Sequence, residues 1–348
     1  MAIQYFGTFP TVEYTLTKDP TDAKTVVDIT KRVGIRNDFS EYISSYYKHV
    51  VTDGRRPELY ALSAYGSILD HWILLHVNGV VDPYFDWVLD YAKFDAYMQK
   101  KYPDEVLIYD ITTISPDGKF FIIGETITGS PSGDTATVKD SNPDLGQIVY
   151  TNGPDWKTSA KTFDGVDDVD PSTDRITVTG HGLVTNNLVV YTTGVDIVEG
   201  LTSGTTYYAI RIDDDTLSLS LTLSGSVIAL TADGGSGNHL LTPIDVITGS
   251  ESGASATFES TVKEYAAPKF YEVVRDNGDG SEDRLNVSRG FSDAERAKLP
   301  GGISSWVAPV AIDNATYEYR LNEENREVKM LNPGLIESFE EDFKDKIQ

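Results

Sequence analysis

The histidines are the first residues of this 348-residue chain to consider for metal or acid–base chemistry. They are His49, His71, His76, His181 and His239. A helix does not place His71 and His76 on one face, because the zinc-binding spacing is i, i+4 and these two are farther apart. His181 stands in Thr-Gly-His-Gly-Leu between two predicted strands, which indicates a turn. The histidines therefore predict neither a zinc site nor a general base.

Other catalytic signatures are also missing from the sequence. Cysteine is absent, which excludes disulfides, thiolate zinc sites and cysteine nucleophiles. No G-x-S-x-G, H-E-x-x-H or P-loop pattern occurs. The acidic stretch 276–283 resembles a calcium loop, but Gly278 and Gly280 occupy positions that need oxygen ligands, so a hairpin loop is expected. No carboxylate pair has an apolar setting that would raise a pKa for catalysis. We therefore predict no enzyme, no cofactor and no metal.

The charge of the chain is concentrated in its middle. The net charge is −25, and residues 104–262 carry 23 acidic and 6 basic side chains. This middle region repels phosphate backbones, so nucleic acid is not an expected partner, and a well-solvated surface explains the acidity. The N-terminus MAIQYFGTFP lacks the pattern of a signal peptide, and the most apolar stretch, 72–81, is far shorter than the roughly 20 residues that span a bilayer. We expect a soluble protein, made inside the cell, without a membrane contact.

The stretch 46–87 organises the rest of the chain. It predicts a strand, a turn, two short helices and a return to extended chain, as an aromatic strand or a loop. The signals are Pro57 at a first helical position, Gly66 as a left-handed cap, a Ser67–Asp70 capping box, Asn78-Gly79 as a stop and the aromatic residues 84–87. The predicted structural core consists of Leu62, Tyr65, Trp72, Leu75 and Trp87.

The ends of the chain flank this unit. Residues 1–45 form an arm whose Phe6 and Phe9 should lie against its own domain or a neighbour's. A third helix, after Asp90, has an aromatic face suited to internal packing or to docking. Towards the C-terminus, hairpins are expected at 270–274 with 284–287 and at 317–321 with 326–331. Pro333 then opens a terminal helix.

Residues 104–262 have an all-β pattern, with turn signals every 8–12 residues. They contain an internal repeat, in which 127–138 matches 247–258. Two copies are too few for a solenoid, so paired hairpins that bracket an inner part, about 173–241, are expected. Within that part, 205–222 predicts a hairpin around three consecutive aspartates.

The chain is therefore predicted to be α+β. Its expected parts are an N-terminal arm at 1–45, a βααβ core with its following helix at 46–103, a β-rich inserted module at 104–262, and C-terminal hairpins with a helix at 263–348.

The central unit resembles a known family. The strand–helix–helix–strand order resembles the LysM fold. The residues Arg56-Pro57-Glu58, Ala64-Tyr65-Gly66, Trp72-Ile73-Leu74-Leu75, Asn78, Asp82-Pro83-Tyr84 and Trp87 resemble the baseplate wedge protein 53 family of T-even-like contractile-tailed phages. Segments 9–14, 27–29, 321–329 and the Pro333 helix continue the resemblance. The β-rich middle departs from the T-even form and resembles modules of phage tail and fibre proteins, cyanophages among them.

The resemblance implies a structural role in the virion. A protein of this family sits in the tail baseplate and clamps neighbouring wedges around the hub. Its partners would be other wedge subunits, the sheath-initiator ring and hub proteins, with multiple copies per virion. The interface candidates are Arg55, Arg56, Tyr84, Phe85, Phe6 and Phe9.

Two alternatives belong to other classes of function. One is a glycan-binding LysM module acting on peptidoglycan, although Arg55-Arg56-Pro57 occupies the place of the Gly-Asp-Thr-Leu-like start of ordinary LysM domains. The other is a cell-wall or capsule hydrolase, motivated only by the many carboxylates and the β-rich middle. A peptidoglycan pull-down and a zymogram would test them.

Overall fold

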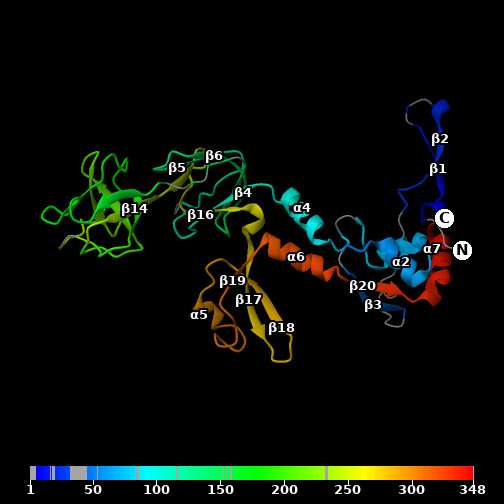
Figure 1. Ribbon diagram of the computed structural model, residues 1–348. Coiled ribbons are helices and arrows are strands. Elements are labelled where there is room, and N and C mark those ends of the chain that lie inside the picture. Colours follow the sequence, from blue (N-terminus) through cyan, green and yellow to red (C-terminus); the bar gives the residue numbers. More distant parts are fainter. Residues whose placement is uncertain are drawn as a thin grey trace. The chain divides into compact units, whose positions relative to one another are not determined.

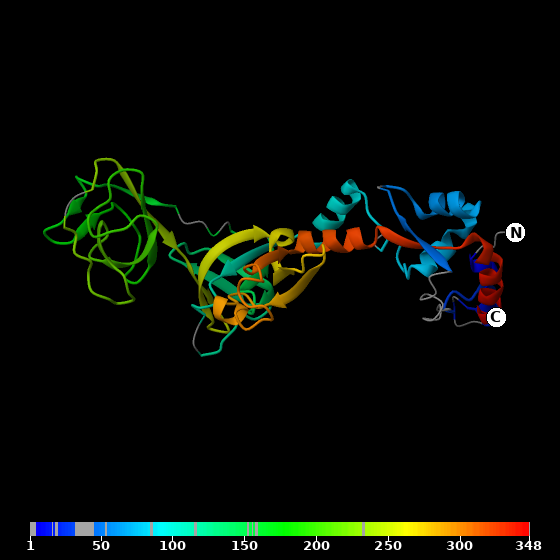
Figure 2. The same cartoon turned by 90° about the horizontal axis from the view of Figure 1, so that it is seen from below.

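The computed structural model of the chain is shown in Figures 1 and 2. It describes residues 5–15, 17, 20–31, 45–52, 54–83, 86–114, 117–151, 153–154, 156, 159–231 and 234–347. Helices and several sheets occur together, and one sheet closes into a six-stranded barrel, which confirms the predicted mixture of helices and strands. The chain divides into two compact units. One is Met1–Lys101 with Ala315–Gln348, and the other is Tyr102–Asn314.

The first unit combines two small sheets with helices from both ends of the chain. Its elements are η1 (Tyr5–Thr8), β1 (Thr11–Tyr14), η2 (Pro20–Asp22), β2 (Lys24–Val27), β3 (Tyr46–Val50), α2 (Pro57–Tyr65), η3 (Ile68–Asp70), α3 (His71–Val77), α4 (Tyr91–Lys101), α6 (Asn314–Glu324), β20 (Glu327–Leu331), η5 (Pro333–Leu335) and α7 (Ile336–Ile347).

Strand β3 pairs with a strand from the far end of the sequence. Its partner is β20, antiparallel, with Tyr46 opposite Leu331 and Val50 opposite Glu327. The strand beside β3 is therefore β20 and not a return strand from the stretch 46–87, and the described residues 86–90 are not in a strand, which agrees with the loop alternative. The predicted hairpin at 317–321 with 326–331 is wrong, because its first half lies in helix α6. Local alternation of apolar residues does not reveal which distant strand satisfies a backbone edge.

Two apolar clusters hold the first unit together. One lies among β3, β20 and the helices α2 and α3, and includes Tyr60, Leu74 and Met330. The other surrounds Trp72, whose ring centroid lies 4.8 Å from that of Phe343 in α7. The predicted terminal helix is thus confirmed, and it packs its buried side against the central helices.

Helices α4 and α6 contact each other near Lys101. The Nζ atom of Lys101 lies 2.8 Å from Oε1 of the buried Glu318, and the Tyr97 hydroxyl donates to Glu318 Oε2 at 3.0 Å. Part of the predicted aromatic face of α4 therefore packs internally. Tyr91, at the start of the helix, is 86% exposed.

The second unit is built around the closed barrel, in the order β15-β16-β4-β7-β6-β5. Its strands are β4 (Glu105–Tyr109), β5 (Thr126–Ser130), β6 (Thr135–Asn142), β7 (Gln147–Tyr150), β15 (Val246–Gly249) and β16 (Ser255–Lys263). Inward-facing side chains such as Leu107, Ile148 and Tyr150 fill the interior. The all-β pattern of this region is confirmed.

The internal repeat forms two hairpins, β5–β6 and β15–β16, which meet through antiparallel pairing of β5 with β15. The acidic residue before each copy reaches the turn of the other. The Glu125 carboxylate accepts hydrogen bonds from the Ser252 N–H at 2.9 Å and its hydroxyl at 2.8 Å. Asp245 accepts from the Ser132 N–H at 2.9 Å and from its hydroxyl. The two copies therefore brace each other.

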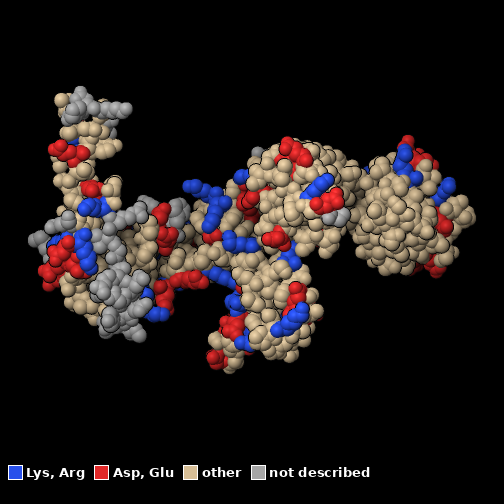
Figure 3. All heavy atoms as spheres, turned by 180° about the vertical axis from the view of Figure 1, so that it is seen from behind, with Lys and Arg blue, Asp and Glu red and all other residues tan. Residues whose placement is uncertain are grey.

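A seven-stranded sheet lies between the repeats in the sequence, in the order β8-β14-β11-β12-β13-β10-β9. Its strands are β8 (Lys161–Asp164), β9 (Val169–Asp170), β10 (Arg175–Thr177), β11 (Leu188–Thr193), β12 (Thr205–Arg211), β13 (Thr216–Ser220) and β14 (Asn238–Ile244). The predicted hairpin is confirmed as β12–β13. In Figure 3 the charged side chains of this module lie towards the rim of the visible face, whose centre is uncharged.

Both histidines of the seven-stranded module have local structural partners. His181 Nδ1 accepts from the Leu183 N–H at 2.9 Å, which fits the predicted turn role. His239 is fully buried, with Nδ1 2.7 Å from the Tyr191 hydroxyl and Nε2 3.0 Å from the Gly235 carbonyl oxygen.

A three-stranded sheet in the order β18-β17-β19 completes the second unit. The remaining elements are η4 (Glu264–Ala266), β17 (Pro268–Asp276), β18 (Glu282–Val287), α5 (Asp293–Arg296) and β19 (Val310–Asp313). The hairpin β17–β18 is confirmed. Arg289 donates to the backbone carbonyls of Tyr109 and Leu145 in the barrel region, at 3.0 and 2.6 Å. These bonds explain why residues 263–314 belong with the barrel, although the sequence grouped them with the C-terminal segment.

Candidate protein interface

The segment before helix α2 is held in place by two aromatic residues. The Thr52 N–H donates to the Tyr60 hydroxyl at 2.6 Å, and the Trp87 indole N–H donates to the Arg55 carbonyl at 3.1 Å. Pro57 then begins α2, where its missing N–H costs nothing. The backbone that carries the two predicted arginines is therefore fixed from both sides.

The two arginines point to different partners. The Arg55 guanidinium lies over the ring of Tyr60, 4.7 Å from its centroid, so its side chain is engaged within the unit. Arg56 is more accessible, since its side chain is 73% exposed and lies 3.4 Å from Glu58. Such an exposed ion pair contributes little to stability, so Arg56 can reorganise towards a partner.

The turn between α2 and α3 differs in detail from the predicted capping box. Gly66 adopts the left-handed conformation with φ 81°, as predicted for a helix end. The Ser67 hydroxyl accepts from the Leu69 N–H at 3.1 Å and starts η3. The reciprocal bond from Asp70 is absent, so this half of the prediction is wrong: Asp70 is 4% exposed and its Oδ1 has no hydrogen-bond partner.

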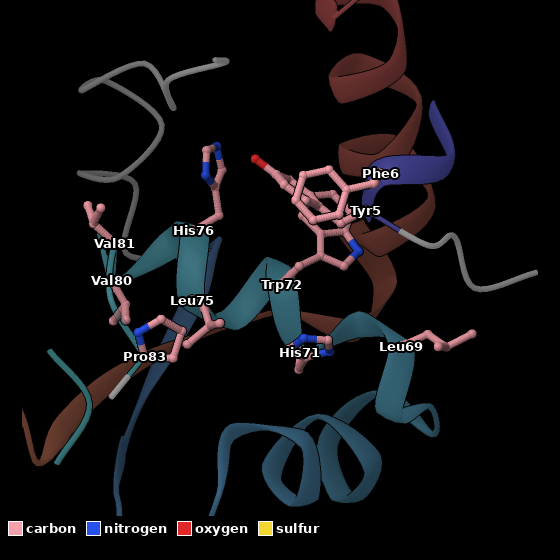
Figure 4. Close-up of a pocket in the computed structure, with 10 residues that line it drawn as sticks. All are labelled: Tyr5, Phe6, Leu69, His71, Trp72, Leu75, His76, Val80, Val81 and Pro83. Carbon is pink, nitrogen blue, oxygen red and sulfur yellow. The ribbon is translucent and has the colours of Figure 1, made fainter. Parts of the chain in front are cut away.

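A groove of about 560 Å³ opens beside helix α3, as Figure 4 shows. It lies among η1, η3, α3 and the loop after α3. Its lining is almost entirely apolar and consists of Tyr5, Phe6, Leu69, His71, Trp72, Leu75, His76, Val80, Val81 and Pro83. Burial lowers the pKa of His76 below its ordinary value, so this imidazole is neutral at physiological pH. The lining contains no Asp, Glu, Lys or Arg.

The rim of the groove exposes large apolar side chains. Phe6 is 53% exposed and Val81 is 82% exposed, and Ile68 and Leu69 are 52% and 38% exposed nearby in sequence. Sequence reasoning identified Phe6 but missed Val81. The sequence does indicate an exposed valine here, because Val80 and Val81 follow the end of a helix and a short turn cannot bury both side chains.

Three of the predicted interface residues are not seen on an exposed surface of the described structure. Phe9 is only 7% exposed and packs against Tyr5 and Phe343, which is the first of the two placements expected for the arm. The Phe9 side chain is therefore buried by contacts within the first unit. Tyr84 and Phe85 lie outside the described residues.

The predicted core residues differ in their burial. Trp72 and Trp87 are each 5% exposed. Tyr65 and Leu75 are partly buried, and the Tyr65 hydroxyl accepts from the Leu331 N–H at 2.9 Å. Burial raises the pKa of Tyr65 above its usual range. Leu62 is 48% exposed and was wrongly placed in the core, because α2 turns Tyr60 and Ala61 inward instead.

Within the described ranges, no three His, Asp or Glu side chains gather closely enough to hold a metal ion. None of the described helices is both long and apolar enough to cross a membrane.

Comparison with known proteins places the groove in a recognised region. Residues 4–104 match the family described as base plate wedge protein 53. This range contains η1, both central helices and every residue that lines the groove. No curated protein matches the chain.

Proposed function

We propose that this chain clamps neighbouring wedges around the hub of a phage tail baseplate. It belongs to the base plate wedge protein 53 family through residues 4–104, and the members of that family are structural proteins of the baseplate. Its partners are other wedge subunits, the sheath-initiator ring and hub proteins. The first unit makes the clamping contacts, and its central helices form the LysM-like part of the fold.

The groove beside α3 is the observation that carries this proposal. Permanent protein contacts bury large, mostly apolar areas and have few charges at their centre. The groove is lined without Asp, Glu, Lys or Arg, its rim exposes Phe6 and Val81, and Arg56 is exposed in the same unit. An apolar surface of this kind on a folded protein marks an interaction site.

A charge placed on the rim tests the proposal. Val81→Asp sets an anion where a partner side chain would exclude water, while it leaves the fold intact because Val81 is 82% exposed. We expect binding to wedge subunits to weaken by tenfold or more, which corresponds to about 1.4 kcal/mol, with an unchanged melting temperature. The measurement is co-purification with wedge subunits and recovery of tails in a complementation assay.

The matched control is Val184→Asp, since Val184 is 55% exposed in the second unit and outside the family match. It should assemble like the unmodified chain. Normal assembly of the Val81→Asp variant would remove the groove from the clamp, and normal tails formed without the protein would remove the structural role altogether.

A further inference from the structure

The hairpin β1–β2 is the least supported element of the first unit. Figure 1 shows it standing away from the helices. All eight of its strand residues are exposed. Its apolar side chains include Val12, Tyr14 and Val26, which are 45%, 57% and 39% exposed. An isolated two-stranded hairpin is marginally stable in water, and three or more strands are needed for independent stability.

The register of this hairpin divides its side chains between two faces. Val12 lies opposite Val26, and Tyr14 lies opposite Lys24, so these four share one face. The other face carries Thr11, Glu13, Thr25 and Val27. One face is therefore mainly apolar, and the other carries the carboxylate of Glu13.

Among the described residues, the sheet β3–β20 has a hydrogen-bonded outer edge along β20 and an unpaired outer edge along β3. The Asn78 carboxamide seals β20, because it accepts from the Lys329 N–H at 2.7 Å and donates to the Lys329 carbonyl at 2.8 Å. The Tyr65 hydroxyl adds a bond to the Leu331 N–H on the same strand. Among the described residues, no hydrogen bond reaches the outer edge of β3. Unpaired strand edges bind extended chains.

The open edge and the hairpin match each other in polarity. Tyr47 and His49 lie on the same face of the sheet as the buried Met330 and Val328, and Tyr47 is 44% exposed. Lys48 lies on the opposite face, where its Nζ atom is 2.5 Å from Oε1 of Glu327 and 65% of its side chain is exposed. A hairpin strand that extends the buried face with Val12 and Tyr14 necessarily places Glu13 on the face of Lys48. One alignment therefore extends the apolar face of the sheet and brings Glu13 beside the exposed Lys48–Glu327 ion pair on the other face.

We propose that the β1–β2 hairpin of one copy of this chain adds to the outer edge of β3 in a second copy. The contact forms a four-stranded sheet that satisfies the backbone groups of both edges. Donor and acceptor are different surfaces, so the interface is heterologous and repeats around a ring if the rotation closes. This contact goes beyond the proposed clamp and does not depend on the groove.

Cross-linking of single-cysteine variants tests the contact. The chain has no cysteine, so an introduced thiol reacts alone. Val12→Cys and Tyr47→Cys proteins, carrying different tags, are mixed and treated with a short bismaleimide. We expect the mixed cross-link severalfold above that of Val12→Cys with Val184→Cys, whose site is exposed in the second unit. Adding Val26→Asp to the Val12→Cys chain should reduce the yield to this control level without changing its melting temperature.

Equal yields from the two mixtures would overturn the proposal, as would a cross-link that survives Val26→Asp. The proposal would also be overturned if, in assembled baseplates, Val12→Cys formed cross-links only to a different protein. The Val81→Asp variant should still cross-link, so a failure of the groove as a clamp is distinguishable from a failure of the hairpin contact.

Discussion

At the scale of single residues, the second unit depends on close approaches that leave no room for a side chain. Gly129 and Gly249 occupy equivalent positions in the two repeat copies. A Cβ on Gly129 would lie 2.5 Å from Asp245 Oδ2, and one on Gly249 would lie 2.5 Å from Glu125 Oε2. The sequence shows the repeat, but it does not show why both copies keep glycine there. That reason is the crossing of each carboxylate into the opposite turn.

We therefore expect Gly129→Ala to destabilise the second unit by about 1–3 kcal/mol, because the methyl group displaces the Asp245 carboxylate from Ser132. Urea unfolding of the purified chain measures the change. Gly194→Ala is the matched control, since a Cβ there has open space and the substitution should be neutral or slightly stabilising. Equal stability of the two variants would show that the turns do not brace each other.

At the scale of elements, local signals predicted the pieces better than their pairing. Pro57, Gly66 and Gly79 mark the helix boundaries of the first unit as expected, because caps and turns are determined by neighbouring residues. Local signals of this kind could not predict which strand pairs with β3. That strand lies more than 270 residues away, and it was predicted correctly at 326–331 but assigned to a hairpin.

Asn78 illustrates the same limit. The sequence assigned it to the end of a helix, and it is the C-cap of α3. Its carboxamide also binds the backbone of Lys329, 251 positions later. No local sequence pattern predicts that a side chain will form hydrogen bonds with the backbone of a strand far away in the sequence.

Substitution of Asn78 by alanine should therefore cost more than the loss of a helix cap. It removes two hydrogen bonds to Lys329 and one to the Leu74 carbonyl, and it exposes the β20 edge, so we expect about 2–3 kcal/mol lower stability of the first unit. Thermal unfolding followed by tryptophan fluorescence measures this. Asn78→Asp keeps the acceptor and should retain part of the stability. A loss as small as that of an exposed cap would contradict the role in the sheet.

At the scale of the whole molecule, both ends of the chain resemble the same family. The structure joins Met1–Lys101 with Ala315–Gln348 in the first unit. The change in composition predicts that the β-rich region starts at residue 104, and the second compact unit begins at Tyr102. The sequence pattern of β17 and β18 is that of ordinary hairpins, and distant contacts join this region to the barrel: Arg289 donates to the carbonyls of Tyr109 and Leu145, and the Gln147 side chain donates to the Pro268 carbonyl.

The first unit should consequently fold without the second. Lys101 and Glu318 hold the ends of α4 and α6 together, so a short Gly/Ser linker can replace Tyr102–Asn314. We expect this variant to unfold cooperatively and to keep the buried environment of Trp72 and Trp87, read by fluorescence and near-ultraviolet circular dichroism. Excision of 104–262 alone is the comparison. It leaves the β17–β19 sheet without the barrel that Arg289 contacts, and it should aggregate or melt at a lower temperature. A stable protein from the second excision and an unfolded one from the first would instead favour the boundary that the sequence suggested.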